Sequence, residues 1–429
     1  NYVYVSCENN FRKDNGKLYD TVLKKENISN PSGLLHIGDN FISDFKIPLK
    51  KGITAVYYPN IWDIVLCPCS QWGDFFPNKQ ISDDPYTRII YSFSILCLYN
   101  KNRSHFFDRR FFADLDGFSY LFFAPLTVAI ALDIFNDPNI QKQYSKVYFA
   151  ARDGYIPQKI YDIISSGKNK IKSEYLYVSR QALCYSAFKD FFDYYDRMNW
   201  GDEQYKLQNF LNYIIVDNNL KNKILSNLSE EEKNIDLHIN PIGGRKSIFP
   251  FKKELDNYFS EQKQLSRIYY QSIFSKKSKR ELVFDCGYSG SVSNGLGNAC
   301  GGEKLFDKYY LWENAKNSEC DEKNGSKTIC FFSGEAPLGL NIILEECFSP
   351  CSGSCVGFKK TGSQVEPIVD ELYVNELMKA DMKRIEDNCI DYTKRFVKIF
   401  GEYFESIHIE KRNRFIDTGY RGFLYSPYC

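Results

Sequence analysis

The stretch that decides the fold reads Lys-Val-Tyr-Phe-Ala-Ala-Arg-Asp-Gly-Tyr and occupies residues 146 to 155. Its first part, Lys146–Ala151, is a short and mostly apolar run of the kind found in buried strands. A polar turn with a glycine follows, and Ile156–Ser165 then has the apolar spacing of a helix. A strand that passes through a tight turn into a helix is the repeating unit of parallel α/β sheets.

The same pattern recurs on both sides of this stretch. A helix is expected at Phe118–Phe135, and further strands are expected at Glu174–Val178, Glu281–Phe284, Lys308–Trp312 and Thr328–Phe332. Residues 202–275 are mostly polar and helical, and residues 370–407 form an amphipathic helical pattern. The sequence therefore predicts a Rossmann-like α/β domain over residues 116–365 with a helical insertion, followed by a helical C-terminal segment over residues 366–429.

Polar residues gather after three of the expected strands. They are Arg152, Asp153 and Gly154 after the first, Ser179 and Arg180 after the second, and Asp285, Gly287, Ser289, Gly290 and Ser291 after the third. Because the carboxyl ends of parallel strands meet at one edge of a sheet, we expect these residues to converge on a ligand. The arginines could bind a phosphate or carboxylate, the Gly/Ser loop before a helix is suited to an anion, and either aspartate could act as a base, hold a metal or orient a sugar hydroxyl. The alternative is that Arg and Asp form structural pairs at the sheet edge.

Two further groups of residues have open interpretations. Glu345 and Glu346 are either additional site residues or surface charges. Cys347, Cys351 and Cys355 recur at every fourth position, as in some metal sites. We favour small core or loop residues for these cysteines, since no Cys-x-x-Cys pair or nearby histidine completes a zinc set.

Residues 1–60 show a second alternation of strands and helices. Strands are expected at Tyr2–Ser6, Leu34–Ile37 and Thr54–Tyr58, with helices at Lys17–Glu26 and Ile42–Lys50. Residues 61–115 are less regular and are interpreted as a connecting segment with one helix near Pro85–Tyr99. The chain therefore has two α/β regions, and the first is the smaller.

The smaller region carries two carboxylates with a spacing that suits a metal. Asp39 and Asp44 lie in Gly38-Asp39-Asn40-Phe41-Ile42-Ser43-Asp44, at the point where a strand gives way to a helix. Carboxylates at such a strand end are suitable ligands for Mg²⁺, which could neutralise phosphate oxygens. Ser6 ends another expected strand and could bond a phosphoryl oxygen, while Lys13 could balance phosphate charge.

These motifs resemble those of the haloacid dehalogenase (HAD) superfamily. Val5-Ser6 is similar to its second motif, Lys13 (or Lys17) to its third, Gly38-Asp39 with Asp44 to its fourth, and Lys51–Val56 to the strand that follows. The resemblance implies a Mg²⁺-dependent phosphohydrolase in which Asp39 and Asp44 hold the metal and Ser6, Lys13 and Asp39 take part in catalysis. The family's first motif, with its nucleophilic aspartate, has no counterpart here. We therefore expect residues 1–60 to be the later part of a HAD-like domain, truncated at its start or degenerate.

The order of the two regions, over residues 1 to 360, is similar to large HAD-type hydrolases of bacteria. Those proteins occur with glycosyltransferases in capsule, O-antigen or teichoic-acid gene clusters. The resemblance implies a phosphorylated sugar or nucleotide-sugar as substrate and glycosyltransferases as partners. The alternatives are a non-catalytic scaffold, or a glycosyl or phosphoryl transferase whose activity resides in residues 116–365.

Composition limits the class of protein. The 429 residues include 55 Lys and Arg against 54 Asp and Glu, and this balance argues against a general nucleic-acid binder. No signal-peptide pattern is visible, and the longest apolar stretch, Phe118–Phe135, contains Pro125 and Asp133, which favours a buried helix over a transmembrane segment. The 14 cysteines are scattered rather than arranged as a disulfide framework. We therefore expect a cytoplasmic protein.

Overall fold

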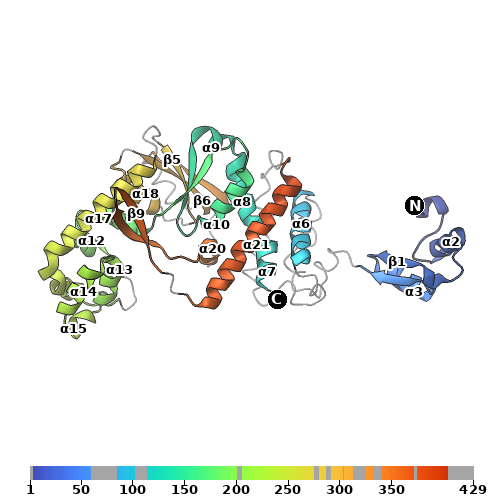
Figure 1. Ribbon diagram of the computed structural model, residues 1–429, viewed down its shortest axis with the longest axis horizontal. Helices are drawn as coiled ribbons and strands as arrows, with labels where there is room; N and C mark the ends of the chain where they lie inside the picture. Colours follow the sequence, from blue (N-terminus) through green and yellow to red (C-terminus); the bar gives the residue numbers. More distant parts are fainter. Residues whose placement is uncertain are drawn as a thin grey trace. The chain divides into compact units, whose positions relative to one another are not determined.

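The computed structural model describes residues 3–58, 85–101, 114–200, 205–274, 280–286, 291–302, 304–312, 325–332, 340–371 and 374–403 (Figure 1). Its contacts divide the chain into two compact units. Unit 1 comprises Asn1–Gly117 and Thr418–Cys429, and unit 2 comprises Phe118–Asp417. The division at Gly117 lies close to the expected start of the larger domain at residue 116. Residue 366, where a helical C-terminal segment was expected to begin, instead lies inside a strand of unit 2.

Unit 1 contains a two-stranded parallel sheet. Strand β1 (Leu35–Gly38) pairs with β2 (Thr54–Tyr57), as the sequence predicted. The helical segments of its described part include α1 (Ser6–Asn9), α2 (Lys17–Lys25), η1 (Pro31–Gly33), η2 (Phe41–Lys46), α3 (Ile47–Lys50) and α6 (Pro85–Lys101).

The strand expected at Tyr2–Ser6 is wrong for its described residues. Residues 3–5 have no regular structure, and Ser6 begins α1. A strand needs a neighbour for its backbone hydrogen bonds, and within the described part of unit 1 β1 and β2 pair only with each other. The alternating apolar pattern of this segment is therefore not sufficient to make it a strand.

Unit 2 is built on a five-stranded parallel sheet. Its strands are β3 (Lys146–Ala150), β4 (Lys172–Leu176), β5 (Arg280–Phe284), β6 (Leu305–Trp312) and β7 (Thr328–Phe332). They are arranged in the order β4-β3-β5-β6-β7. This is a doubly wound order, in which the sheet grows from β3 in one direction and then from β5 in the other. The expected α/β, Rossmann-like fold class is confirmed at this level.

Helices cover both faces of this sheet. Helices α8 (Ala124–Asn136), α10 (Tyr155–Ser165) and α21 (Glu376–Phe400) pack together, and α11 (Arg180–Ala187), α17 (Lys252–Ile273) and α18 (Ser291–Ala299) form a second group. Tyr148 and Ala150 of β3 belong to the core of the second group, whereas Phe149 contacts Tyr161 of α10. Burial on both faces explains why the strands are continuous apolar runs.

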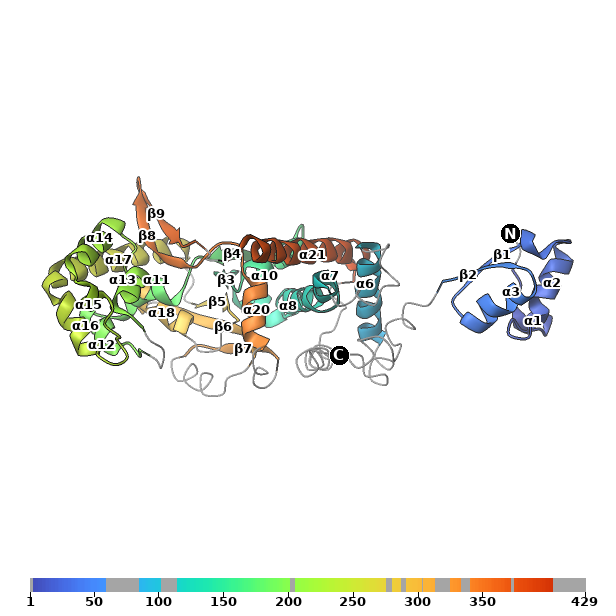
Figure 2. The ribbon, with the colours of Figure 1, turned by 90° about the horizontal axis from the view of Figure 1, so that it is seen from below.

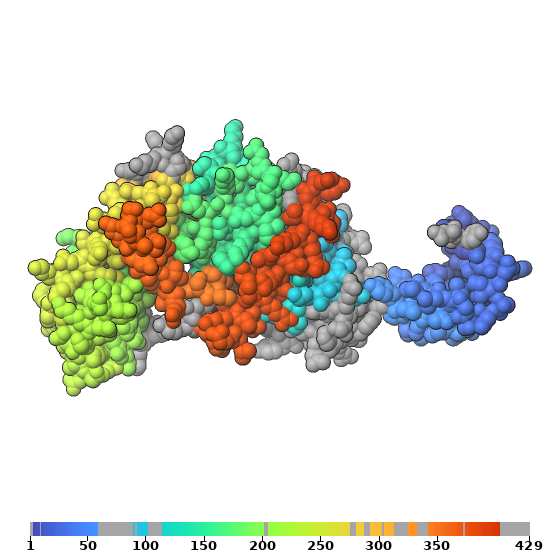
Figure 3. Space-filling model, in the orientation of Figure 1, coloured from blue at the N-terminus to red at the C-terminus, as the bar shows by residue number. Residues whose placement is uncertain are grey.

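A helical insertion separates β4 from β5. It contains α12 (Phe191–Arg197), α13 (Leu207–Ile214), α14 (Asn218–Asn227), α15 (Glu230–Lys233) and α16 (Pro241–Ile248), which surround an aromatic-rich core. After β7 the chain forms α20 (Leu340–Phe348), the hairpin β8 (Cys355–Thr361) and β9 (Gln364–Val369), and α21. Figures 2 and 3 show the hairpin and α21 on the same face of unit 2, with the insertion at one end of that unit.

One helix is long and apolar enough to cross a membrane. It spans Leu115–Asn136, through α7 (Leu115–Phe118), η5 (Ser119–Phe123) and α8, and its most apolar window has a mean hydropathy of 1.8. That window is 89% buried, as in the core helix of a soluble protein. Asp133, its buried carboxylate, accepts a hydrogen bond from the Tyr309 hydroxyl of β6. The expectation of a buried helix is therefore confirmed.

Candidate functional site

The turn after β3 has an unusual backbone. A Cβ atom at Gly154 would lie 2.6 Å from the Cβ of Phe149 and 2.7 Å from the carbonyl oxygen of Ala150, so this turn has room only for glycine. Arg152 has a φ of +69°, in the left-handed region that costs a side-chain-bearing residue of order 1 kcal/mol. Its backbone N–H donates to the Tyr175 hydroxyl of β4 at 2.9 Å, which helps to hold this conformation. Strained backbone of this kind is concentrated at functional sites.

Two aspartates meet across neighbouring strands beside this turn. Asp153 follows β3, and Asp285, which is buried, follows β5. Burial raises the pKa of Asp153 well above its usual value, and the charges of Asp285 and Glu345 and a hydrogen bond with Asp285 raise it further, against the opposing charge of Arg152. Two carboxyl groups in hydrogen-bond contact cannot both ionise easily, so this contact favours the protonated form of Asp153.

The pair lies at the point where ligands bind in open α/β sheets. Strands β3 and β5 are neighbours and lie where the strand order changes direction. The crevice outside the carboxyl ends of two such strands is the usual binding site of this architecture. The convergence expected from Asp153 and Asp285 is therefore present in the structure.

Helix α20 adds two acidic residues that the sequence left undecided. Glu346 Oε1 lies 3.2 Å from Nη2 of Arg152, and the Nε atom of Arg152 is buried without a partner among the described residues. Burial raises the pKa of Glu345, although the charges of Arg152 and Arg180 lower it. The sequence signal was an acidic pair inside the mostly apolar helix Leu-Asn-Ile-Ile-Leu-Glu-Glu-Cys-Phe.

The remaining expected site residues have different surroundings. Ser179 caps α11 by accepting the N–H of Ala182 at 2.9 Å and donates to the Cys355 carbonyl oxygen, so its hydroxyl has a structural role. Arg180 begins α11, is exposed, and is close enough to affect Glu345. Ser291 is the first residue of α18. Gly287, Ser289 and Gly290 lie outside the described residues.

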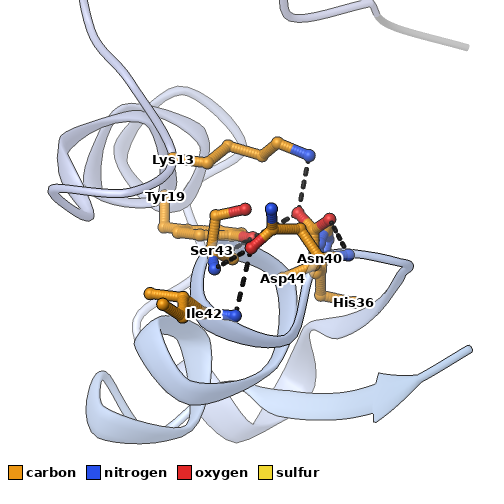
Figure 4. Close-up of polar contacts among 7 residues, drawn as sticks. All are labelled: Lys13, Tyr19, His36, Asn40, Ile42, Ser43 and Asp44. Carbon is orange, nitrogen blue, oxygen red and sulfur yellow. Dashed lines mark hydrogen bonds and ion pairs between the residues drawn. The ribbon is translucent and has the colours of Figure 1, made fainter. Parts of the chain in front are cut away.

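In unit 1, Asp44 is the centre of a cluster of hydrogen-bond donors (Figure 4). Its Oδ1 atom lies 2.6 Å from Lys13 Nζ and 3.2 Å from His36 Nε2, and its Oδ2 atom accepts the Asn40 N–H at 3.0 Å. Burial alone would raise the pKa of Asp44, but these hydrogen bonds hold it below its usual value. A Cβ atom at Gly38 would lie 2.5 Å from the Asp44 side chain, which explains why glycine ends β1.

The structure does not gather the other residues expected in unit 1 around this cluster. Asp39 is exposed and makes no hydrogen bond or ion pair with the described residues, and Ser6 is exposed at the start of α1. The free carboxylate of Asp39 fits a Mg²⁺ ligand, whereas both oxygens of Asp44 are already engaged. Among the residues that the structure describes, no three His, Cys, Asp or Glu side chains form a metal-binding group.

No protein-family model matches this chain, and no curated protein is significantly similar to it. Function must therefore be inferred from the chemistry of the two clusters.

Proposed function

We propose that unit 2 is an enzyme domain that carries out group transfer on a phosphorylated sugar at the carboxyl edge of its sheet. The observation that carries this proposal is the hydrogen-bonded pair of carboxyl groups, Asp153 and Asp285, at the point where the strand order reverses. A carboxyl with a raised pKa can accept or donate a proton near neutral pH, which is what general acid–base catalysis requires. A sugar hydroxyl that attacks a phosphoryl or glycosyl group is a suitable proton donor.

The neighbouring arginines supply the contacts for an anionic group. Arg152 has an unused buried Nε, and Arg180 lies at the adjacent strand end. A guanidinium group can bind phosphate through two parallel hydrogen bonds. The raised pKa values of Asp153 and Glu345 favour their uncharged forms, which lowers the negative charge that an incoming anion would meet.

Two other mechanisms fit less well. The paired carboxyls of glycosidases stand about 5 to 9.5 Å apart around the bond that they cleave, whereas Asp153 and Asp285 are in direct hydrogen-bond contact. Cys286 follows Asp285, but burial and the nearby carboxylates raise the pKa of its thiol well above the usual value, which disfavours a thiolate nucleophile. The dyad therefore supports proton transfer to or from a hydroxyl.

A second candidate function belongs to unit 1. Lys13 and Asp44 are 31 residues apart in the sequence and form a 2.6 Å ion pair, which places the third- and fourth-motif residues of the HAD resemblance together. We propose that unit 1 is a HAD-like domain, with Asp39 as a ligand for Mg²⁺, whose chemistry would be to neutralise phosphate oxygens. The alternative role for unit 1 is a non-catalytic scaffold.

The combined proposal is a cytoplasmic bacterial protein of surface-polysaccharide synthesis. It would act on a sugar phosphate or nucleotide-sugar and work beside glycosyltransferases. A screen of these substrates with and without Mg²⁺ tests it, using wild type, Asp153→Asn and Asp39→Asn. We expect turnover to be lost in Asp153→Asn and kept in Asp39→Asn. The reverse pattern would assign the chemistry to unit 1.

A further inference from the structure

The guanidinium group of Arg152 is only partly used in the structure. Glu346 contacts Nη2 through a single oxygen at 3.2 Å, while Nε has no partner among the described residues. An oxyanion that binds an arginine side-on uses Nε together with a terminal nitrogen. Glu346 therefore occupies only one of the two nitrogens that an oxyanion would use, and it leaves Nε available.

We propose that Glu346 is a specificity-determining residue, a resident carboxylate that competes with the substrate for Arg152 and makes the site prefer phosphate dianions to carboxylates. This inference rests on the proposed anion site and adds the substrate class to it. It separates a phosphorylated sugar from an acidic sugar, two ligands that a pair of arginines alone would not distinguish.

Charge explains the preference. A carboxylate on a ligand has the same charge and the same two oxygens as Glu346, so replacing one with the other gains little. A phosphate monoester has a second pKa near 6, carries close to two charges at pH 8, and has three terminal oxygens. One of these three oxygens can reach the free Nε of Arg152 while another faces Arg180.

Arg152 and Glu346 are held in place to different degrees, and this difference indicates which side chain can move. The backbone of Arg152 is held by the Tyr175 hydroxyl and by the tight turn at Gly154. The side chain of Glu346 is 45% exposed and extends from a helix, so it can rotate toward solvent. A carboxylate ligand that takes both Nε and Nη2 would therefore have to displace Glu346, whereas a phosphate can bind the free Nε and Arg180 without breaking that contact.

Calorimetry with three glucose derivatives tests this at pH 8. Glucose 1-phosphate is the phosphate probe, glucuronate is the carboxylate probe, and glucose is the uncharged reference. The test variant is Glu346→Gln. The control is Glu254→Gln, which removes a similar half-exposed carboxylate from a 3.1 Å ion pair with Lys223 beside the helical insertion.

We expect wild type to bind glucose 1-phosphate about tenfold more tightly than glucuronate. Because a half-exposed ion pair is worth up to about 1 kcal/mol, Glu346→Gln should bind glucuronate about fivefold more tightly, with a smaller gain for the phosphate. The ratio of the affinity for glucose 1-phosphate to the affinity for glucuronate should fall in Glu346→Gln and stay unchanged in Glu254→Gln.

Each contrary result has a distinct meaning. If wild type binds the phosphate and Glu346→Gln has the same or weaker affinity for both probes, the competitor role is overturned and the ion pair is structural. If neither wild type nor Glu346→Gln binds glucose 1-phosphate, the anion site itself is refuted, and the competitor role is refuted with it. Arg152→Ala should abolish binding, and retained affinity would move the site elsewhere.

Discussion

Asp44 of unit 1 and Asp153 of unit 2 both follow the end of a parallel strand, yet their surroundings are opposite in kind. Asp44 faces donors, namely the Lys13 ammonium group, His36 and the Asn40 N–H, which lower its pKa. Asp153 is buried beside the acceptors Asp285 and Glu345, and burial raises its pKa most, with the charges of these two carboxylates raising it further. The same side chain is therefore fixed as an anion in one unit and held near protonation in the other.

This difference separates a structural role from a chemical one. A carboxylate whose lone pairs are filled by donors stabilises the fold, and it neither accepts a further proton readily nor has oxygens left for a metal. A carboxyl that shares a proton with a neighbour costs stability at neutral pH but can exchange that proton with a substrate. A protein that keeps such a destabilising carboxyl pair is expected to use it for chemistry.

Replacement of Asp153 by Asn should have the most pronounced consequence for activity. Loss of a positioned acid–base group typically reduces turnover by about 10²- to 10⁴-fold. Steady-state assays on the substrate found in the screen would measure it, while calorimetry should show that glucose 1-phosphate still binds. Full activity in Asp153→Asn would remove the dyad from the mechanism.

Replacement of Asp44 by Ala should destabilise unit 1 by about 3 kcal/mol, because three donors lose a buried acceptor. The effect depends on pH in a defined direction. The folded-state pKa of Asp44 is lowered, so its contribution is present above the unfolded-state pKa near 4 and is lost as the pH falls through the folded value.

Chemical denaturation of both variants at pH 7 and pH 3 checks this expectation, with Asp39→Ala as the control. Asp39 is exposed and unpaired among the described residues, so its removal should change stability by less than about 0.5 kcal/mol. Equal losses in the two variants would contradict the structural role of Asp44.

Replacement of Arg152 by Gly should stabilise unit 2 by about 1 kcal/mol, since glycine adopts a φ of +69° without strain. The same change should abolish binding of glucose 1-phosphate. Thermal unfolding and calorimetry on one preparation would show both results. A variant that is less stable than wild type would mean that Arg152 is held in the turn for structural reasons.

The pH dependence of unit 2 should show a smaller effect of opposite sign to that of unit 1. Because the folded-state pKa of Asp153 is raised, its contribution to stability is present below the unfolded-state pKa near 4 and is lost as the pH rises through the folded value. Asp153→Asn should therefore gain stability relative to wild type between pH 4 and pH 8. A constant difference across this range would indicate an unshifted pKa.

Much of this arrangement follows from local sequence. The continuous apolar runs before Arg152 and Asp285 predict buried parallel strands, and the geometry of a parallel sheet then brings their polar ends together. The role of Ser179 was not predictable, because an N-cap and a ligand contact both need a hydroxyl at a strand end.

The contributions of α20 and of the donors around Asp44 could not be derived from sequence. Glu346 is 194 residues from Arg152, and His36 lies outside any motif that predicts a contact with Asp44. The hairpin β8–β9 was missed because its lysines and threonine resemble loop residues. Each of these contacts depends on tertiary packing, which cannot be read from the local sequence pattern.

The most direct test is a ¹³C NMR titration of the aspartate carboxyl carbons in the full chain, with assignments from Asp44→Asn, Asp153→Asn and Asp285→Asn. We expect the Asp153–Asp285 pair to retain one proton well above the usual aspartate range, and the partner carboxyl to titrate closer to that range when either aspartate is replaced. Asp44 should titrate below the usual range in the same spectra. If Asp153 and Asp285 both titrate independently near pH 4, the pair shares no proton, and the proposed acid–base site is contradicted.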